Sequence, residues 1–255
     1  MRFLRRLILL ILFLGVAGLI VAFTLPADLA LRWFKPNLGP VQVAGVSGTL
    51  WHGRAASVTV FGTPVGALDW QVDKAPVLLR QIVARLNLSG GSITAKGEVM
   101  RDPDGSIAAD NVDFAFPAEL AAPALDIPSL KLLGRVDGHI DEARLAGGWV
   151  HGARGKARWR DAGVTGEAEA RFGDLTVEFA SKGDHSIAGT VKDDGTSGLI
   201  VDGQFVVQGG QFDVTARLSA RNGDPQVQEA LRYIGQLQPD GSSLLKIHGQ
   251  LFKLL

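Results

Sequence analysis

Beyond residue 40, apolar and polar residues alternate with a period of two along most of the chain. In the stretch DLTVEF, for example, Leu175, Val177 and Phe179 take every second position, with polar residues between them. This pattern is typical of strands that bury one face and expose the other. It recurs at 58–60, 68–72, 93–99, 136–140, 187–191, 199–207, 211–221 and 245–251. The alternation predicts about eight to eleven strands.

The connections between these segments are short and turn-like. Four of them contain dipeptides that accept the backbone of a tight hairpin, namely Asp104-Gly105, Asp194-Gly195, Asn222-Gly223 and Asp240-Gly241. Short links join antiparallel neighbours, and no helix of crossover length recurs between the segments. The sequence therefore predicts a mainly β fold built on a long antiparallel sheet.

Glycine is unusually frequent, with 32 residues in a chain of 255. Several glycines fall on the apolar phase of the strands, including Gly97, Gly138, Gly189, Gly203 and Gly249. A glycine in a strand allows a bend or bulge, and bends let a long sheet curve. We therefore expect a strongly curved sheet.

Two segments follow a helical spacing instead. The stretch APVLLRQIVARLNL begins near Pro76 and places apolar residues from Leu78 to Leu86 on one face. The stretch DPQVQEALRYIGQL has Asp224 as an N-cap, Pro225 in the first turn and Gly235 as a terminator. We expect two short amphipathic helices that cover the open face or an end of the sheet.

The N-terminal region predicts a membrane anchor. Residues 7–27 carry no charge and are long enough to span a bilayer as a helix. Residues 1–6 contain Arg2, Arg5 and Arg6, which favours a cytoplasmic N-terminus with residues 28–255 in the periplasm. The alternative is a cleaved signal peptide, whose apolar stretch is usually shorter. The anchor places residues 28–255 on the far side of the membrane, and residues 27–34 continue as a short interfacial helix.

Two similar motifs raise the hypothesis of an internal duplication. GTLWHGRAASVTV at 48–60 and GGWVHGARGKARW at 147–159 both place Trp and His before a Gly and an Arg. The corresponding halves would be 40–117 and 134–255, joined by a proline-containing bridge or edge strand over 117–133.

Composition excludes several functions. The 26 basic residues balance the 26 acidic ones, which disfavours nucleic-acid binding. Cysteine is absent, so disulfides, thiol nucleophiles and cysteine metal sites are excluded. The five histidines show no metal-binding spacing, and no phosphate loop, dinucleotide fingerprint or nucleophile elbow occurs. We expect no metal, no cofactor and no enzymatic activity.

The cluster around Trp51 is the most distinctive motif. A catalytic interpretation makes His52 a base and Arg54 an anion clamp. A structural interpretation makes Trp51 and Trp70 apolar anchors, Gly53 a bend and Arg54 a charge at a sheet edge. We favour the structural interpretation because no second half of a catalytic site is visible. Elsewhere, His139, Asp137 and a serine could form a catalytic triad. The sequences at 102–105 and 192–195 resemble calcium-binding loops only at their first positions.

Three motifs, together with the basic N-terminus and the span, resemble type II secretion system protein N, also called general secretion pathway protein N. They are GVSGTLWHGRA, LDWQVDKAPVLL and LRYIGQLQPDGSSLLKIHGQL. The resemblance implies a non-enzymatic accessory component of the type II protein secretion machinery. Its implied partners are platform proteins of the inner membrane and, beyond them, the outer-membrane secretin. It carries no catalytic residue, and Trp51, Gly53 and Arg54 match its most recognisable motif.

The predicted architecture is also similar to that of AsmA-like envelope proteins, which handle lipid. An open apolar trough would bind or convey phospholipid, whereas a trough closed by the two helices would leave edges and loops for protein contacts. An anchored periplasmic hydrolase is the third hypothesis. Whether the apolar face is open or closed distinguishes the lipid-binding hypothesis from the secretion hypothesis.

Overall fold

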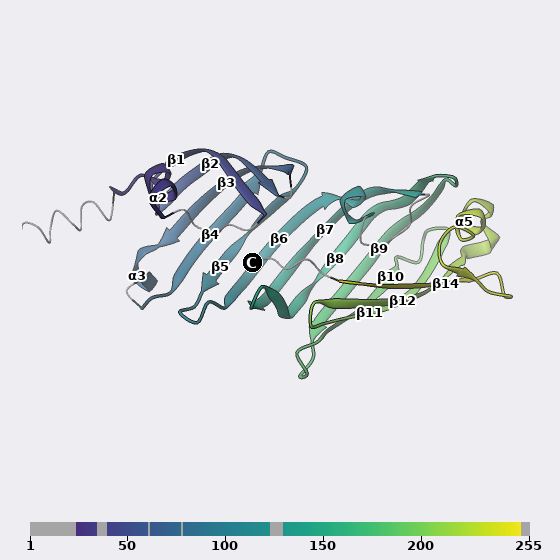
Figure 1. Cartoon of the computed structure of the whole chain (residues 1–255). Helices are drawn as coiled ribbons and strands as arrows, with labels where there is room; N and C mark the ends of the chain where they lie inside the picture. The colour runs from purple at the N-terminus through teal and green to yellow at the C-terminus, as the bar shows by residue number, and fades with distance from the viewer. Residues whose placement is uncertain (1–23, 35–39, 61, 78, 123–129, 251–255) are drawn as a thin grey trace, which may run out of the picture.

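One continuous antiparallel sheet makes up almost all of the described structure (Figure 1). The computed structural model describes residues 24–34, 40–60, 62–77, 79–122 and 130–250. Within these ranges fourteen strands are hydrogen-bonded side by side, in chain order from β1 to β12. The last two exchange places, so that β14 pairs with β12 and β13 lies outside β14. The prediction of a mainly β fold with one long antiparallel sheet is confirmed.

The strands are β1 (Val41–Gly48), β2 (His52–Val60), β3 (Thr63–Asp73), β4 (Ile82–Ser89), β5 (Thr94–Arg101), β6 (Ile107–Pro117), β7 (Leu130–Ala146), β8 (Trp149–Gly166), β9 (Ala170–Ser181), β10 (Ile187–Asp193), β11 (Leu199–Gln208), β12 (Gln211–Ala220), β13 (Gln236–Leu237) and β14 (Ser243–Gln250). The helices are α2 (Ala27–Phe34), α3 (Lys74–Val77) and α5 (Pro225–Ala230), with short 3-10 turns η1 (Ala118–Ala121) and η2 (Arg221–Gly223).

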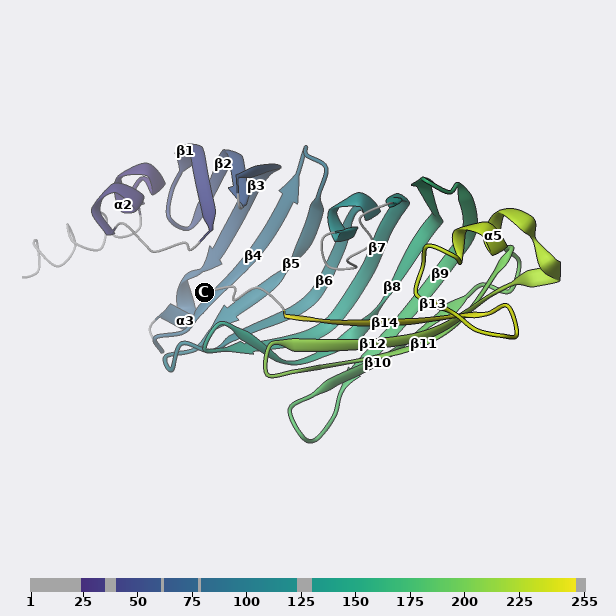
Figure 2. The same cartoon turned by 45° about the vertical axis from the view of Figure 1, so that its right-hand side comes forward.

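The sheet is curled into a trough, as expected. In Figure 2 strands β4 to β9 form the ribs at the back, and β10, β11, β12 and β14 sweep across the front. The pairing of β7 with β8, the two longest strands, contains three register shifts. Register shifts of this kind bend a strand and add to the right-handed twist that every sheet accumulates.

Alternation along the strands gives the sheet an apolar inner face and a charged outer face. The inner face bears Leu68 in β3, Val177 in β9 and Ile247 in β14. Its buried residues form one cluster beside α5, a second in β2 and β3, and a third where β7, β8 and β10 begin or end. The curled sheet thus buries apolar side chains against itself and the short helices.

Aromatic rings on the inner face lie over glycines of the neighbouring strand. The paired residues face each other directly in the register: Phe114 and Gly138, Phe179 and Gly155, Phe205 and Gly189, Phe212 and Gly249. A Cβ built on Gly138 would lie 2.6 Å from Phe114 Cζ, and one on Gly249 would lie 2.5 Å from Phe212 Cζ. These glycines therefore make room for a ring, which the expectation of a simple bend had missed.

Two of the expected helices are confirmed. The helix predicted over residues 27–34 is α2, which buries Ala27 and Ala30. In α5 the Asp224 carboxylate accepts hydrogen bonds from the backbone N–H groups of Gln226 and Val227, as an N-cap does. The helix ends at Ala230, earlier than the predicted terminator Gly235, and the apolar residues through Ile234 are buried in the largest cluster.

The amphipathic helix predicted from Pro76 to Leu86 is wrong. Among the described residues of this stretch only the four of α3 are helical, and β4 begins at Ile82. From Ile82 the apolar residues Ala84, Leu86 and Leu88 also alternate with a period of two, so both spacings fit this stretch. The sheet decides between them, because β4 completes the ladder between β3 and β5.

Five strands were absent from the sequence prediction, namely β1, β4, β6, β8 and the two-residue β13. In β8 the inner positions are occupied by Ala153, Gly155 and Ala157, which hydropathy alternation does not mark as apolar. β6 is irregular at Asn111, where the register with β5 shifts. Small residues and bulges hide the period of two from the sequence.

The bridge predicted over 117–133 begins with η1, and residues 123–129 lie outside the described ones. The sheet runs without a break through this region because β6 pairs with β7. The division into halves remains a prediction. The predicted membrane span falls mostly on residues 1–23, which are not described. No helix among the described residues has the length and apolar character needed to cross a membrane.

Three of the four predicted turns, at Asp104, Asp194 and Asp240, share an Asp-x-Ser/Thr arrangement with an unpredicted turn at Asp184, whereas Asn222-Gly223 lies in η2, which leads into α5 instead of a hairpin. At Asp104, Asp184 and Asp240, one carboxylate oxygen accepts hydrogen bonds from both the hydroxyl and the backbone N–H of the serine two residues on. Asp194 binds Thr196 in the same way, through its two oxygens. The first loop that resembles a calcium site therefore uses Asp104 for its own turn, and the second uses Asp194.

The glycine and aromatic pairing predicts a steric effect. Gly138→Val should destabilise the fold by about 1–3 kcal/mol, because the new side chain overlaps the Phe114 ring and the Lys156 carbonyl oxygen. The matched control is Gly183→Val, since Gly183 has open space around it and an ordinary φ. Urea unfolding of the two variants checks the prediction, and equal midpoints would contradict it.

The turn carboxylates predict a pH dependence. Hydrogen bonds from Ser106, Ser186 and Ser242, side chain first, lower the pKa of Asp104, Asp184 and Asp240 below the ordinary value of 3.8. The backbone N–H of Thr196 does the same, as the largest cause, for the pKa of Asp194. A lowered folded pKa stabilises the fold above the unfolded value of about 3.9, and this contribution is lost as the pH falls through the folded pKa.

Stability should therefore stay constant down to about pH 4 and decline below it. Carboxyl NMR titration measures the individual pKa values. Ser106→Ala should raise the pKa of Asp104 and leave those of the other three aspartates where they are. An equal change in the pKa of all four aspartates would refute a local origin of the pKa shifts.

Candidate functional site

The distinctive Trp51 motif lies at the hairpin between β1 and β2, where the chain arriving from the N-terminus meets the sheet. Thr49 N–H donates to the His52 carbonyl over 2.8 Å and closes the turn. Leu50 N–H donates to the Leu25 carbonyl over 3.1 Å, and Pro26 forms an isolated bridge with Thr49. These bonds fasten the segment leading into α2 to the hairpin.

Trp70 is the aromatic centre of this corner. Its ring packs against the buried cluster of β2 and β3, and its Nε1–H donates to the Leu50 carbonyl over 3.1 Å. Gly53 faces Trp70 in the register, and a Cβ on Gly53 would lie 2.2 Å from Trp70 Cζ2. Gly53 thus leaves space for the Trp70 indole, as the other inner-face glycines leave space for phenylalanine rings.

Trp51 is in a different environment. It is only half-buried, in contrast to the buried aromatic that the sequence led us to expect. Lys74 Nζ lies 5.7 Å from the centroid of a Trp51 ring, within the range of a cation–π contact. The Trp51 carbonyl accepts a hydrogen bond from Val72 N–H over 2.7 Å.

Arg54 is not at a sheet edge, so that expectation is wrong. β1 lies outside β2 and occupies the edge instead. On the outer face Arg54 Nη1 lies 3.0 Å from each carboxylate oxygen of Asp69, its direct cross-strand neighbour. Both side chains are largely exposed, so the pair contributes about 0–1 kcal/mol.

An apolar cavity of about 440 Å³ lies between α2 and the inner face of the first strands; we call it the α2 cavity. Ala27, Ala30 and Leu31 of the helix form one wall. The rest is lined by Val43, Val46, Leu50, Ala55, Leu68, Trp70, Val72, Ala84 and Leu86. The Trp51 motif therefore shapes one end of an apolar trough.

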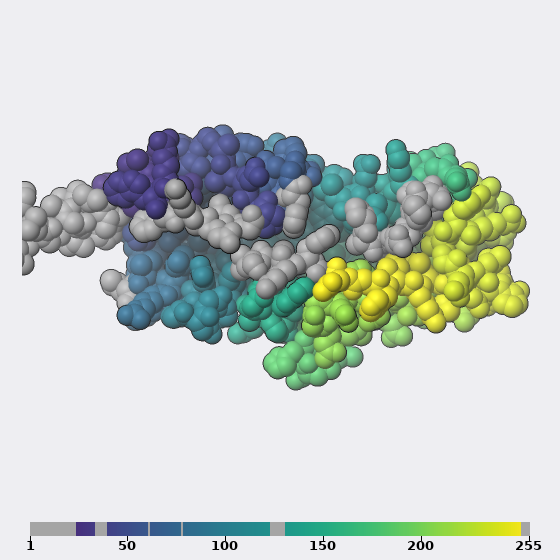
Figure 3. Space-filling view, viewed as in Figure 1, coloured from purple at the N-terminus to yellow at the C-terminus, as the bar shows by residue number. Residues whose placement is uncertain are grey.

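A second cavity, of about 250 Å³, lies where Leu231 and Ile234, just beyond α5, pack over the inner face at the other end; we call it the α5 cavity. Its lining is also wholly apolar. Between the two cavities the inner face is half-buried at Val99, Val112, Phe114, Ile140, Phe179 and Phe205. Figure 3 shows α2 and β1 in purple at one end and α5 and β14 in yellow at the other. The helices cover the ends of the trough and leave its middle partly accessible.

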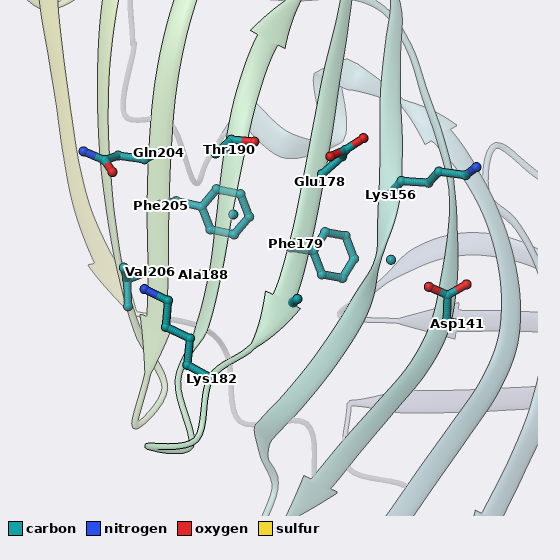
Figure 4. Close-up of a pocket in the computed structure, with 13 residues that line it drawn as sticks. Asp141, Lys156, Glu178, Phe179, Lys182, Ala188, Thr190, Gln204, Phe205 and Val206 are labelled. Atoms are coloured by element: carbon teal, nitrogen blue, oxygen red, sulfur yellow. The ribbon is translucent and has the colours of Figure 1, made fainter.

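The outer face contains a shallow depression of about 650 Å³ over β8 to β11, lined by both polar and apolar residues (Figure 4). Lys156, Glu178, Thr190 and Gln204 lie at one level on four successive strands, as their register requires. Charges of both signs line it.

The histidines do not assemble the chemistry considered from the sequence. His139 Nδ1 lies 2.7 Å from Asp113 Oδ1, whereas Asp137 pairs with Arg160 over 2.7 Å. His52 is exposed on the outer face, on the same strand as Arg54. Among the described residues no group of three histidine or carboxylate side chains could hold a metal ion.

The sequence did not locate either cavity. Their walls come from strands far apart in the chain and from helices whose positions the sequence left open. The available signal was the run of apolar residues in Ala27–Phe34, which we had assigned to the membrane interface. The structure adds that this helix also packs against the sheet.

Replacing Trp51 or Trp70 by alanine should lower the free energy of unfolding by different amounts. Trp70→Ala should cost about 3 kcal/mol, because it removes a ring packed on Gly53 and its hydrogen bond to Leu50. Trp51→Ala should cost about 1 kcal/mol, since it mainly loses a half-exposed cation–π contact. Urea unfolding of both variants measures the difference, and a larger loss at Trp51 would contradict these roles.

Comparisons with known proteins agree on one assignment. The family model for type II secretion system (T2SS), protein N, matches residues 39–246. A type II secretion system protein N from Vibrio cholerae serotype O1 (strain ATCC 39315 / El Tor Inaba N16961) is similar to this chain, with 31% identity over 143 residues. That match covers 54% of this chain and 56% of the relative, so it spans about half of each. No solved structure matches the chain. Because the family match extends across nearly the whole sheet, the chain belongs to the type II secretion system protein N family.

Proposed function

We propose that the chain is a non-enzymatic accessory component of the type II secretion machinery, anchored in the inner membrane with its sheet in the periplasm. The observation that carries this proposal is the family match over residues 39–246, which includes β1 to β12 entire. The uncharged residues 7–27 and the preceding arginines support the anchor and its orientation.

The outer face supports contacts with other proteins of the machinery. It presents ion pairs along the sheet: Arg54 with Asp69 and Arg85 with Asp73 join neighbouring strands, and Arg217 of β12 pairs with Asp240 in the turn before β14. Exposed pairs of this kind add little stability, so their partners are exchangeable. Charged surfaces steer association and select partners by complementarity. We infer that platform proteins dock on this face.

Site-specific photocrosslinking in cells that assemble the machinery tests the proposal. A photoreactive residue at position 54 or 217 samples the outer face at either end of the sheet, and one at Val177 samples the inner face as a control. We expect platform proteins to be trapped from the outer positions. Failure of both outer positions to trap one would refute docking on this face.

The topology can be tested separately because the chain has no cysteine. Gly183→Cys introduces a single thiol in an exposed turn. A thiol reagent that does not cross membranes should label it in cells with a permeabilised outer membrane and an intact inner membrane. Labelling only after the inner membrane is opened would place the sheet in the cytoplasm.

A second function is favoured by the inner face. The trough has a wholly apolar cavity at each end and half-buried apolar side chains between them. This arrangement supports an AsmA-like role in binding or conveying lipid. Native mass spectrometry of the protein in mild detergent should then detect phospholipid, and a spectrum of lipid-free protein alone would remove this candidate.

A further inference from the structure

The α2 cavity has the character of a binding site for a purely apolar group. The twelve described residues that line it are all apolar. The one side-chain hydrogen-bond donor among them, Trp70 Nε1–H, is already bonded to the Leu50 carbonyl. A polar ligand would lose its hydrogen bonds to water and find no side-chain replacement here, whereas an alkyl chain loses none.

Helix α2, which covers the cavity as a lid, has one buried side and one exposed side. Ala27 and Ala30 face the sheet and are 2% and 4% exposed, and their small side chains leave the space beneath the helix open. On its other side Leu29 is 37% and Trp33 is 71% exposed. Leu50 of the adjoining hairpin is 40% exposed. Apolar surface therefore lies both under the lid and around it.

The position of the lid in the chain indicates where the ligand comes from. The uncharged run of residues 7–27 ends where α2 begins, so a chain anchored by that run leaves the bilayer directly beside the cavity. A tryptophan such as Trp33 is favoured at the membrane interface. Arg32 in the last turn of the helix and Lys74 near Trp51 are basic groups that can bind a lipid phosphate, whereas the acidic Asp28 lies in the first turn.

We propose that the α2 cavity holds one acyl chain of a phospholipid from the surrounding bilayer, with α2 as its lid. This inference rests on the proposed membrane anchor and names the site where the trough receives lipid. The phosphate group stays outside, beside Arg32, and only the hydrocarbon chain enters.

The test uses the full chain in vesicles of phosphatidylethanolamine and phosphatidylglycerol that contain a phospholipid with a photoreactive group near the end of one acyl chain. After irradiation, crosslinked peptides are identified by mass spectrometry. We expect crosslinks in β3 and β4, around Leu68 and Leu86, in addition to the anchor. Crosslinks confined to residues 7–27 would overturn the proposal, and this result needs no variant.

A pair of variants gives the matched comparison. Ala84→Phe fills the cavity from its wall, whereas Ala44→Phe adds the same ring at an exposed position on β1. Crosslinks to the cavity should fall at least about fivefold in the first variant and stay unchanged in the second, because a filled volume excludes the chain. Circular dichroism verifies that both fold, and Ala30→Phe fills the space from the lid if Ala84→Phe does not. Equal cavity crosslinking in the folded, filled variant and the unaltered chain would refute the assignment.

Extraction with alkaline carbonate separates this inference from the proposed function. Release of the chain from membranes refutes the anchor and this route for lipid with it. Retention in the membrane, together with crosslinks only in residues 7–27, refutes the lipid site alone. Absence of crosslinks to platform proteins contradicts the proposed protein contacts but does not affect the proposed lipid site.

Discussion

The pairing of an aromatic ring with a glycine across two strands is the contact on which the structure depends. A domain normally buries a sheet against a second layer. Here the described layers are one sheet and a few short helices, so the sheet must bury its apolar side chains by curling. A ring laid over a facing glycine packs closely against the neighbouring backbone, as Phe114 does on Gly138 and Trp70 does on Gly53. The same arrangement repeated along the chain gives a curved inner face without a second sheet.

Curvature in turn decides where the trough is closed. At the C-terminal end the residues of α5 and the turn after it pack into the largest buried cluster, with Val227 and Leu231 fully buried. At the N-terminal end the described side chains of α2, residues 27–33, include two buried alanines, and a larger cavity remains beneath the helix. One end is thus packed as a structural core, while the other combines a loosely filled space with exposed apolar side chains. This asymmetry is the reason to place a ligand under α2.

The two proposed functions belong to different faces of the sheet. The outer face balances its charges locally, with exposed ion pairs that cost little to exchange for a partner's side chains. Among the described residues that line its two cavities, the inner face is apolar. Protein contacts outside and lipid inside are therefore compatible functions of a single sheet in a member of the protein N family.

The sequence by itself determined the strand-rich character, the antiparallel turns, the helix at 27–34 and the cap at Asp224, because each follows from local spacing or local hydrogen bonding. It also sufficed for the family resemblance. Only the tertiary structure decided that residues 82–89 form a strand, since two periodicities fit them and the ladder between β3 and β5 selects one. The roles of Arg54 and Gly53 were likewise settled by their cross-strand neighbours Asp69 and Trp70, which lie 15 and 17 positions along the chain. A strand's partners, register and cavity walls are long-range properties, and no local pattern of residues specifies them.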